Sequence, residues 1–577
     1  MSTASLLQTI EANAQANPRA ESERNQALKE VEVIFSRWIR RVSRTNNSKR
    51  PCIANMGRLL PCGSVKLGVM DAASDIDCLC VAPSFATREE FFATFAQDLK
   101  RCQRVTSVTV IAEAFVPVIK LKYLQFEMDI LFVQLHVETL PENIEEALLD
   151  DAILTDLPVK CVRSVNAFRI AGQILEFVPD QEKFRTTLKA VKLWAKSRGI
   201  YSNIHGYLGG ISWTILTAKT CQTYPESEPP QLLERLFSMM LNWNWPDPIV
   251  LNEEKPSNVQ PHLEKCVWNP RTNPHDRLQL MPILTPTYPR QNSAFNVAAY
   301  TQIVILEKCK EALGIIEEIK DGKSSWEKLL GRVDFFGQFA HFISIECSAR
   351  TKDEHNAFSN LAESKLRVLM ASLFGSGQLK YFHANPRKFS PKAIKNNNFG
   401  HCWFIGFRPC GHVFKLDQEL AAFKRNLHEA ARKLPNFNDF MKLECSPMPR
   451  KRVASLIMDG SEPEKRTQIS PAKSGPARIE HKPIHLRLTR KDPVSGLFSS
   501  FEKMNLGPSR TSNGPTRISN GPTWNQRPRT DSDRTTSSRS SEDGEFKPKM
   551  GRSGSGSGGN NPPTSRHFKP RNLGHVF

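Results

Sequence analysis

Three aspartates, each in an apolar stretch, most constrain what this 577-residue chain can fold into. Asp75 and Asp77 flank Ile76 in CGSVKLGVMDAASDIDCLCVAP, and Asp129 lies in a second apolar run, QFEMDILFVQL. Side chains two residues apart on a β-strand point to the same face. The spacing therefore predicts that Asp75 and Asp77 project together while Ile76 turns into the core. A carboxylate on a neighbouring strand would complete a cluster of three acids.

Such a cluster suits metal-dependent phosphoryl chemistry. Carboxylate oxygens are hard ligands that Mg²⁺ prefers, and two ions about 3.5–4 Å apart can clamp the attacking and leaving oxygens of an in-line displacement. A lone Asp-x-Asp is more often a polar strand end. Here Gly63 and Ser64 precede the pair, and a glycine turn lets backbone amides approach a phosphate. The pattern favours a nucleotidyl-transfer site with two Mg²⁺ or Mn²⁺ ions on Asp75, Asp77 and Asp129.

The net charge of +20 is concentrated near the C-terminus. Residues 451–577 hold 23 Lys and Arg against 11 Asp and Glu, a balance of +12 that leaves +8 for the first 450 residues. Because residues 447–577 are rich in Ser, Gly, Pro and Asn, we predict a disordered basic tail. It would attract RNA by neutralising phosphates, or serve only as a solubilising, regulated tail. Pro449-Arg450-Lys451-Arg452 fits a nuclear-localisation patch.

The cysteines and the hydropathy of the chain indicate the kind of cellular compartment in which it works. The 13 cysteines show no disulfide framework, which indicates free thiols in a reducing compartment. No apolar run approaches the roughly 20 residues of a membrane span, and the first residues lack the pattern of a secretory signal, so we expect no membrane association. His401-Cys402 and Cys410-x-His412 could in principle bind zinc. Their spacing does not match the separated pairs of structural zinc sites, and we interpret the segment as a buried strand.

Hydrophobic periodicity outlines the folded part. It predicts a helix over 26–42, strands near 77–82, 115–122 and 126–133, a mainly helical region beyond about residue 138, a helix from Gly209 to Ala218, and alternating strands and helices over about 315–445. The second and third strands are joined by a short turn and are predicted to form a hairpin. That hairpin would set Asp129 beside the strand of Asp75 and Asp77.

Several ordered stretches carry a resemblance to a known family: AFVPVIKL, KLWAK, IYSN, GYLGGISW, WPDPIVL, NPHDR and LMPILTPTYPRQNSAFNV. In these the chain resembles the eukaryotic nuclear poly(A) polymerases, members of the polymerase-β-like nucleotidyltransferase superfamily. The resemblance implies template-independent addition of adenylate from ATP to RNA 3′ ends, with divalent metal, in nuclear mRNA 3′-end processing. It also implies an α+β multidomain fold: an N-terminal segment packing with the central domain (1–25), a polymerase-β-like catalytic domain (26–137), a helical central domain (138–314), an RRM-like RNA-binding domain (315–446) and the disordered basic tail (447–577).

The resemblance also implies roles for individual residues beside the three acids. The matched positions are the phosphate turn at Cys62, Gly63 and Ser64, the phosphate contacts Lys192 and Tyr201, the nucleotide-lining Gly210 and Ile211, the adenine-reading Asn203, and the active-site asparagine Asn166. Lys189 and Lys196 share the helical face of Lys192, and we interpret both as solvated.

The chain departs from the family pattern near the phosphate turn. Cys62 replaces an aromatic residue, Asp71 and Ala72 replace a hydroxyl-bearing and a basic residue, and Val65-Lys66 replaces an aromatic-basic pair. These changes put ATP affinity and rate in question. Two alternatives therefore stay open: a terminal transferase with another nucleotide preference, such as uridylate, and a non-catalytic RNA-binding paralogue that acts as a scaffold. The expected partners are RNA 3′ ends, ATP and 3′-end processing factors, with the protein itself a monomer.

Overall fold

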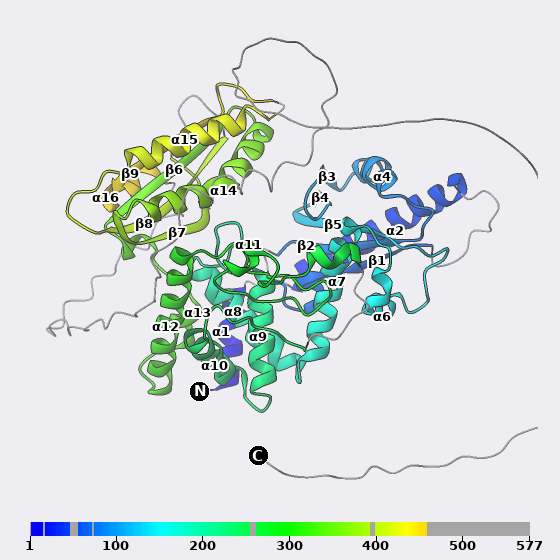
Figure 1. The fold of residues 1–577 in the computed structure, drawn as a ribbon, viewed down its shortest axis with the longest axis horizontal. Helices are drawn as coiled ribbons and strands as arrows, with labels where there is room; N and C mark the ends of the chain where they lie inside the picture. Colours follow the sequence, from blue (N-terminus) through cyan, green and yellow to red (C-terminus); the bar gives the residue numbers. More distant parts are fainter. Residues whose placement is uncertain are drawn as a thin grey trace, which may run out of the picture. The chain divides into compact units, whose positions relative to one another are not determined.

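The computed structural model describes residues 2–14, 18–46, 56–71, 74–253, 261–392, 399–434 and 436–457. The chain beyond residue 457, which holds most of the predicted tail, and Ala72 lie outside the described residues. Within them the fold is of the predicted α+β class, with two sheets and a helical region (Figure 1).

Five strands form the first sheet, in the order β1-β2-β5-β4-β3. They are β1 (Arg58–Pro61), β2 (Ile76–Ala82), β3 (Val105–Ile111), β4 (Val118–Tyr123) and β5 (Phe126–Gln134). β2 and β5 run parallel, and the other neighbours run antiparallel. β4 and β5 form the predicted hairpin and bring β5 beside β2, as the sequence indicated; β1 and β3 are additional to the predicted strands.

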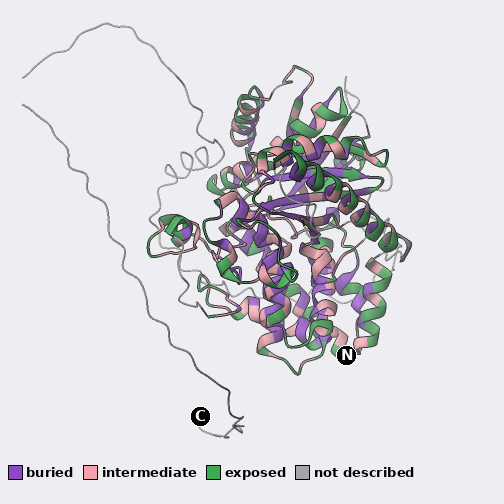
Figure 2. Ribbon diagram, turned by 90° about the vertical axis from the view of Figure 1, so that its right-hand side faces the viewer, coloured by how far each residue is buried: buried purple, intermediate pink, exposed green. Residues whose placement is uncertain are grey.

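Helices pack on both faces of this sheet, and its strands other than β3 are largely buried (Figure 2). Alternation along β2 sends Ile76 and Cys78 into the core with α2, and Leu79 and Val81 into the core with α7. Asp77 shares the alternation of Leu79 and Val81 and therefore lies on the α7 side. The elements packed around the sheet are α2 (Pro18–Asn46), α3 (Gly63–Leu67), α4 (Arg88–Glu90), η1 (Phe91–Phe95), α5 (Ala96–Lys100), α6 (Ile144–Ala147), η2 (Asp151–Leu154) and α7 (Val159–Phe177).

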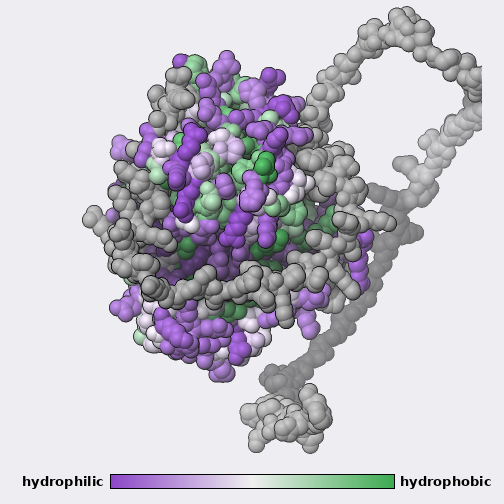
Figure 3. Space-filling model, turned by 90° about the vertical axis from the view of Figure 1, so that its left-hand side faces the viewer, coloured by the Kyte–Doolittle hydropathy of each residue, from purple (hydrophilic) through white to green (hydrophobic). Residues whose placement is uncertain are grey.

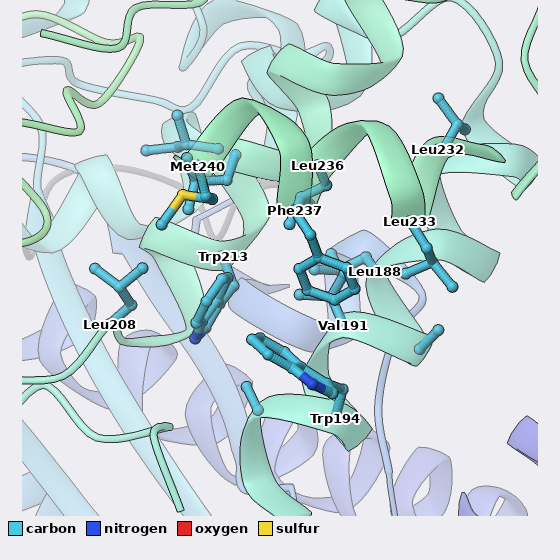
Figure 4. Close-up of a cluster of buried hydrophobic side chains, with 14 of the residues drawn as sticks. Leu188, Val191, Trp194, Leu208, Trp213, Leu232, Leu233, Leu236, Phe237 and Met240 are labelled. Atoms are coloured by element: carbon cyan, nitrogen blue, oxygen red, sulfur yellow. The ribbon is translucent and has the colours of Figure 1, made fainter. Parts of the chain in front are cut away.

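The central region is built on one large hydrophobic core. At its centre Trp194 lies against Trp213 and Phe237, with ring centroids 5.5 and 4.5 Å apart (Figure 4). Leu6 and Ile10 of the N-terminal helix join this core. The helices of the central region are α1 (Thr3–Ala14), α8 (Gln181–Ser197), α9 (Gly210–Thr223), α10 (Pro229–Asn242), η3 (Pro261–Cys266), α11 (Pro274–Arg277), α12 (Ala299–Lys320) and α13 (Trp326–Leu330).

The second sheet has the order β7-β8-β6-β9 with antiparallel neighbours. With α14 and α15 it follows the β-α-β-β-α-β sequence of an RRM-like unit, as predicted. One face packs against the two helices through side chains such as Trp403 and Leu366. The other face packs against Phe336 and Val453. The elements are η4 (Phe336–Gln338), β6 (His341–Ala349), α14 (Lys352–Gly375), β7 (Leu379–Phe389), β8 (Phe399–Pro409), α15 (Asp417–Ala431), β9 (Lys442–Pro449) and α16 (Arg450–Leu456).

The expected domain limits differ from these elements at three places. The limit at 25/26 falls inside α2, and that at 314/315 falls inside α12, whose Ile316 is buried in the central core. The predicted start of the disordered tail at residue 447 is wrong. β9 continues to Pro449, and Val453 and Ile457 are buried against the sheet. The basic run Arg450-Lys451-Arg452 therefore begins a helix.

Candidate active site

The three aspartates lie on adjacent strands. Asp75 directly precedes β2, Asp77 is its second residue, and Asp129 lies on β5. In the parallel pairing of β2 with β5, Asp77 is the direct partner of Asp129. Asp75 is exposed, whereas Asp77 and Asp129 are half-buried. The hairpin thus brings together the acids that the sequence analysis selected.

The electrostatics of this group show mutual repulsion. Burial, followed by the charges of Asp129 and Asp75, raises the pKa of Asp77 to about 6. Burial and the neighbouring carboxylates of Asp129 and Glu127 also raise the pKa of Asp75. Lys120 of β4 offsets part of this charge, because its Nζ lies 2.6 and 2.9 Å from the two Asp129 oxygens. Lys120 was not among the residues predicted from the sequence, although the hairpin register pairs it directly with Asp129.

The side chains of Asp75, Asp77 and Asp129 are of the chemical type that binds a hard divalent cation. They offer carboxylate oxygens, and a cation would relieve the repulsion that raises the pKa of Asp77. In the described part of the chain, no three His, Cys, Asp or Glu side chains are yet grouped closely enough to hold a metal ion. The ion pair of Asp129 with Lys120 is one competing interaction.

The turn expected to bind phosphate, Cys62 to Ser64, lies directly beside Asp77. The Cys62 N–H donates to the Asp77 carbonyl at 2.9 Å, and the Cys62 thiol is fully buried. Cys62 is thereby turned toward the core. Gly63 has a φ of +52°, and a Cβ there would lie 2.5 Å from Asp77 Oδ2, so only glycine fits. Ser64 follows, half-buried, in the first turn of α3.

Two lysines of α8 reach the loop after this turn. Lys192 is only 6% exposed, donates to the Val69 carbonyl at 2.7 Å, and has its pKa lowered to about 8, chiefly by burial. Lys196 is exposed, as predicted for a solvated helix face, and its Nζ also lies 2.6 Å from Asp71 Oδ2. Sequence spacing could not reveal this pair, since 125 positions separate its members. Lys189 is half-buried on the same helix.

Tyr201 borders the same group of charges. Burial, followed by the charges of Asp71 and Asp77, raises its pKa to about 12. A Cβ at Gly210 would lie 2.6 Å from the Tyr201 hydroxyl, so this glycine allows the close approach. Ile211, the next residue of α9, is half-buried against the central core. Gly210, one of the two residues expected to line the nucleotide, therefore lies beside the tyrosine expected to contact phosphate.

The two candidate asparagines have different surroundings. The Asn203 carbonyl accepts a hydrogen bond from Asn296 Nδ2 at 3.1 Å. Asn166 donates to the Tyr288 carbonyl at 3.3 Å and accepts from Arg169 Nη1 at 3.0 Å. Asn166 also lines a cavity of about 220 Å³, together with Phe115, Val116, Arg163, Ile170 and Gln291.

Other polar candidates are engaged elsewhere. Lys66 pairs with Glu145 at 3.1 Å and lies 4.0 Å from the centre of the Phe168 ring. His401 lies 3.0 Å from the Ser359 hydroxyl. In the described ranges every cysteine is a free thiol. No helix there is long and apolar enough to cross a membrane.

Comparison with protein families agrees with this geometry. Three family models match successive parts of the chain: the poly(A) polymerase nucleotidyltransferase domain over residues 1–178, the poly(A) polymerase central domain over 183–332, and the poly(A) polymerase predicted RNA binding domain over 334–399. The chain belongs to the poly(A) polymerase family. Its polymerase-family nucleotidyltransferase domain therefore contains all three aspartates.

Curated members of the poly(A) polymerase family match most of the chain. It is 31% identical to a poly(A) polymerase of Dictyostelium discoideum over 82% of its length, and 32% identical to nuclear poly(A) polymerase 1 of Arabidopsis thaliana over 76%. The chain spans only 59% and 61% of the length of these two relatives. Among solved structures, a cytoplasmic RNA terminal U-transferase is 15% identical, with a TM-score of 0.39 and coverage of 57% of this chain and 99% of that chain.

Proposed function

We propose that this protein is a polynucleotide adenylyltransferase that extends RNA 3′ ends with adenylate from ATP during nuclear mRNA 3′-end processing. The observation that carries the proposal is the parallel pairing of Asp77 with Asp129, with Asp75 at the start of the same strand. Membership of the poly(A) polymerase family supports the reaction, and the names of the Arabidopsis relatives support the nucleus.

Asp75, Asp77 and Asp129 would hold two Mg²⁺ or Mn²⁺ ions. Bound there, the ions would supply Lewis-acid stabilisation of the attacking and leaving oxygens. Gly63 leaves room for the Asp77 carboxylate, and Cys62 ties the turn to β2 through its N–H. We therefore assign Cys62 a positioning role rather than a contact through its thiol.

The remaining residues would bind and orient the substrates. Lys192, Tyr201 and Ser64 would position the triphosphate, while Gly210, Ile211 and Asn203 would border the nucleoside. The RNA 3′-hydroxyl oxygen would attack the α-phosphorus in line, and pyrophosphate would leave. The RRM-like domain would hold RNA upstream of its 3′ end, consistent with the predicted RNA binding role of its family model.

Primer extension with each nucleotide supplied separately tests this function. A labelled RNA primer incubated with Mg²⁺, and in parallel with Mn²⁺, is expected to grow with ATP and much less with UTP, CTP or GTP. Preferential growth with UTP would establish the terminal-transferase alternative. No growth with any nucleotide and either metal, together with intact RNA binding, would establish the scaffold alternative.

The Asp129→Ala variant tests the assigned site. We expect tailing to be abolished while RNA binding stays nearly intact, because the acid would act on the reacting groups and not on the bound RNA. Asp98→Ala is the matched control, since Asp98 lies on α5 and pairs with Arg41 at 2.6 Å. Tailing by Asp129→Ala at the wild-type rate would contradict the assignment.

A further inference from the structure

Asp71 lies where the cationic side chains of the candidate site meet. Its Oδ2 is 2.6 Å from Lys196 Nζ and 3.8 Å from Lys192 Nζ. Lys196 Nζ lies 5.3 Å from the centre of the Tyr201 ring, so the tyrosine borders the same group. Lys192 and Tyr201 are two of the three side chains proposed above to position the triphosphate. The Asp71 carboxylate therefore lies beside the cationic groups that would bind a polyphosphate.

The backbone of Asp71 is anchored on two sides. Its N–H donates to the Ser74 hydroxyl at 3.0 Å, and its carbonyl accepts from Arg24 Nη2 at 2.9 Å. Arg24 belongs to α2, whereas the lysines belong to α8. The Asp71 side chain is 16% exposed. Contacts from two helices thus hold this carboxylate in the site instead of leaving it in solvent.

The charges of this group are partly balanced. Burial alone would raise the pKa of Asp71, but Lys196 and Lys192 outweigh burial, and the pKa is lowered. Asp71 is accordingly an anion at neutral pH, and the two lysines face one negative charge before any ligand binds. An incoming polyphosphate meets a weaker positive potential than the lysines alone would produce.

We propose that Asp71 is an internal counter-ion that occupies the cationic part of the nucleotide site and lowers its affinity for the triphosphate. The proposal rests on the proposed function, since it requires the triphosphate to bind beside Lys192. The triphosphate must either displace the carboxylate from Lys196 or bind next to it against its charge. Both routes weaken binding, and the same carboxylate eases the release of pyrophosphate.

Calorimetric titration with inorganic tripolyphosphate tests this proposal without catalysis. In Asp71→Asn we expect binding to tighten about tenfold relative to wild type, because one nearby negative charge is lost. Asp98→Asn, which removes a paired carboxylate on α5, is expected to bind like wild type. Unchanged or weaker binding by Asp71→Asn would overturn the proposal, because it would mean that Asp71 only positions the lysines. Asp71→Ser provides the same test if the asparagine variant does not fold.

Lys196→Met, made alone and with Asp71→Asn, tests whether the effect passes through the ion pair. The gain in tripolyphosphate affinity caused by Asp71→Asn should be smaller in the Lys196→Met background. An equal gain in both backgrounds would overturn the proposal. In primer extension, Asp71→Asn should lower the KM for ATP as it lowers the Kd for tripolyphosphate. If neither the wild-type protein nor the variants extend RNA, the proposed function is wrong. The titration with tripolyphosphate still decides the role of Asp71 in that case.

Discussion

Gly63 lies so close to Asp77 that a single methyl group would disturb the carboxylate. We expect Gly63→Ala to destabilise the fold by about 1–2 kcal/mol, because φ is +52°. We also expect it to reduce tailing about 100-fold, because the added Cβ would fall 2.5 Å from Asp77 Oδ2. Thermal melting and initial rates of primer extension measure the two effects.

Gly314 provides the control for this substitution. It lies inside α12, and a Cβ there would meet no atom within 4 Å. Gly314→Ala should therefore stabilise the protein by up to about 1 kcal/mol and leave tailing unchanged. Wild-type melting and activity in Gly63→Ala would show that the turn does not constrain Asp77.

The raised pKa of Asp77 predicts a pH-dependent stability of the metal-free protein. Between pH 3.8 and about 6 the folded state keeps a proton that the unfolded state has released. Stability therefore falls as pH rises through this window, and the full penalty is present at pH 7. In EDTA at pH 7, Asp77→Asn should be more stable than wild type by about 1–3 kcal/mol, and the two should converge near pH 4. Equal melting temperatures at pH 7 would contradict this expectation.

At the residue scale, alternation and local spacing predicted the acids but not their partners. The period of a strand was sufficient to place Asp75 and Asp77 together, and a short hairpin was sufficient to bring Asp129 to them. Lys120 was missed because its pairing depends on the register of that hairpin. The Lys196–Asp71 pair was missed because it depends on how α8 packs against the loop, which no local pattern encodes.

At the element scale, α16 completes the RNA-binding domain. Met448, Val453 and Ile457 pack with Phe336 and Phe404 on the face of the sheet opposite α14 and α15. A chain ended after Ser446 would expose this surface, and we expect it to lose about 4 kcal/mol or more of that domain's stability. A chain ended after Ile457 should melt like the full chain. Equal melting of the two truncations would contradict this role of residues 447–457, which comprise the end of β9 and α16.

Helices and strands with a clear hydrophobic periodicity could be predicted from the sequence, and those without one could not. The helix α8 lies in the region predicted to be mainly helical, where Phe184, Leu188 and Val191 recur at helical spacing and are fully buried. β1 has only four residues, and β3 is largely exposed, so neither shows the alternation that reveals a half-buried strand. α16 was assigned to the tail because its basic residues resemble the composition that follows, whereas the buried Val453 and Ile457 are too few to form a periodic signal.

At the scale of the whole molecule, charge and architecture agree with a polyanionic substrate. The net charge of +20 favours association with RNA through phosphate neutralisation. The face drawn in Figure 3 is mostly hydrophilic, with smaller apolar areas among the polar side chains. The chain combines a sheet that presents three acids, a helical region that supplies Lys192 and Tyr201, and an RRM-like unit. These parts together agree with the proposed nucleotide transfer to an RNA end.

The initial rate of primer extension by Asp77→Asn, with RNA, ATP and Mg²⁺, tests the central claim most directly. The account predicts a loss of about a thousand-fold relative to wild type, because a neutral amide cannot replace the anionic carboxylate that would help to hold the metal ions. Asp98→Asn should retain the wild-type rate, and both variants should bind the RNA primer equally. Extension by Asp77→Asn at the wild-type rate would contradict the account.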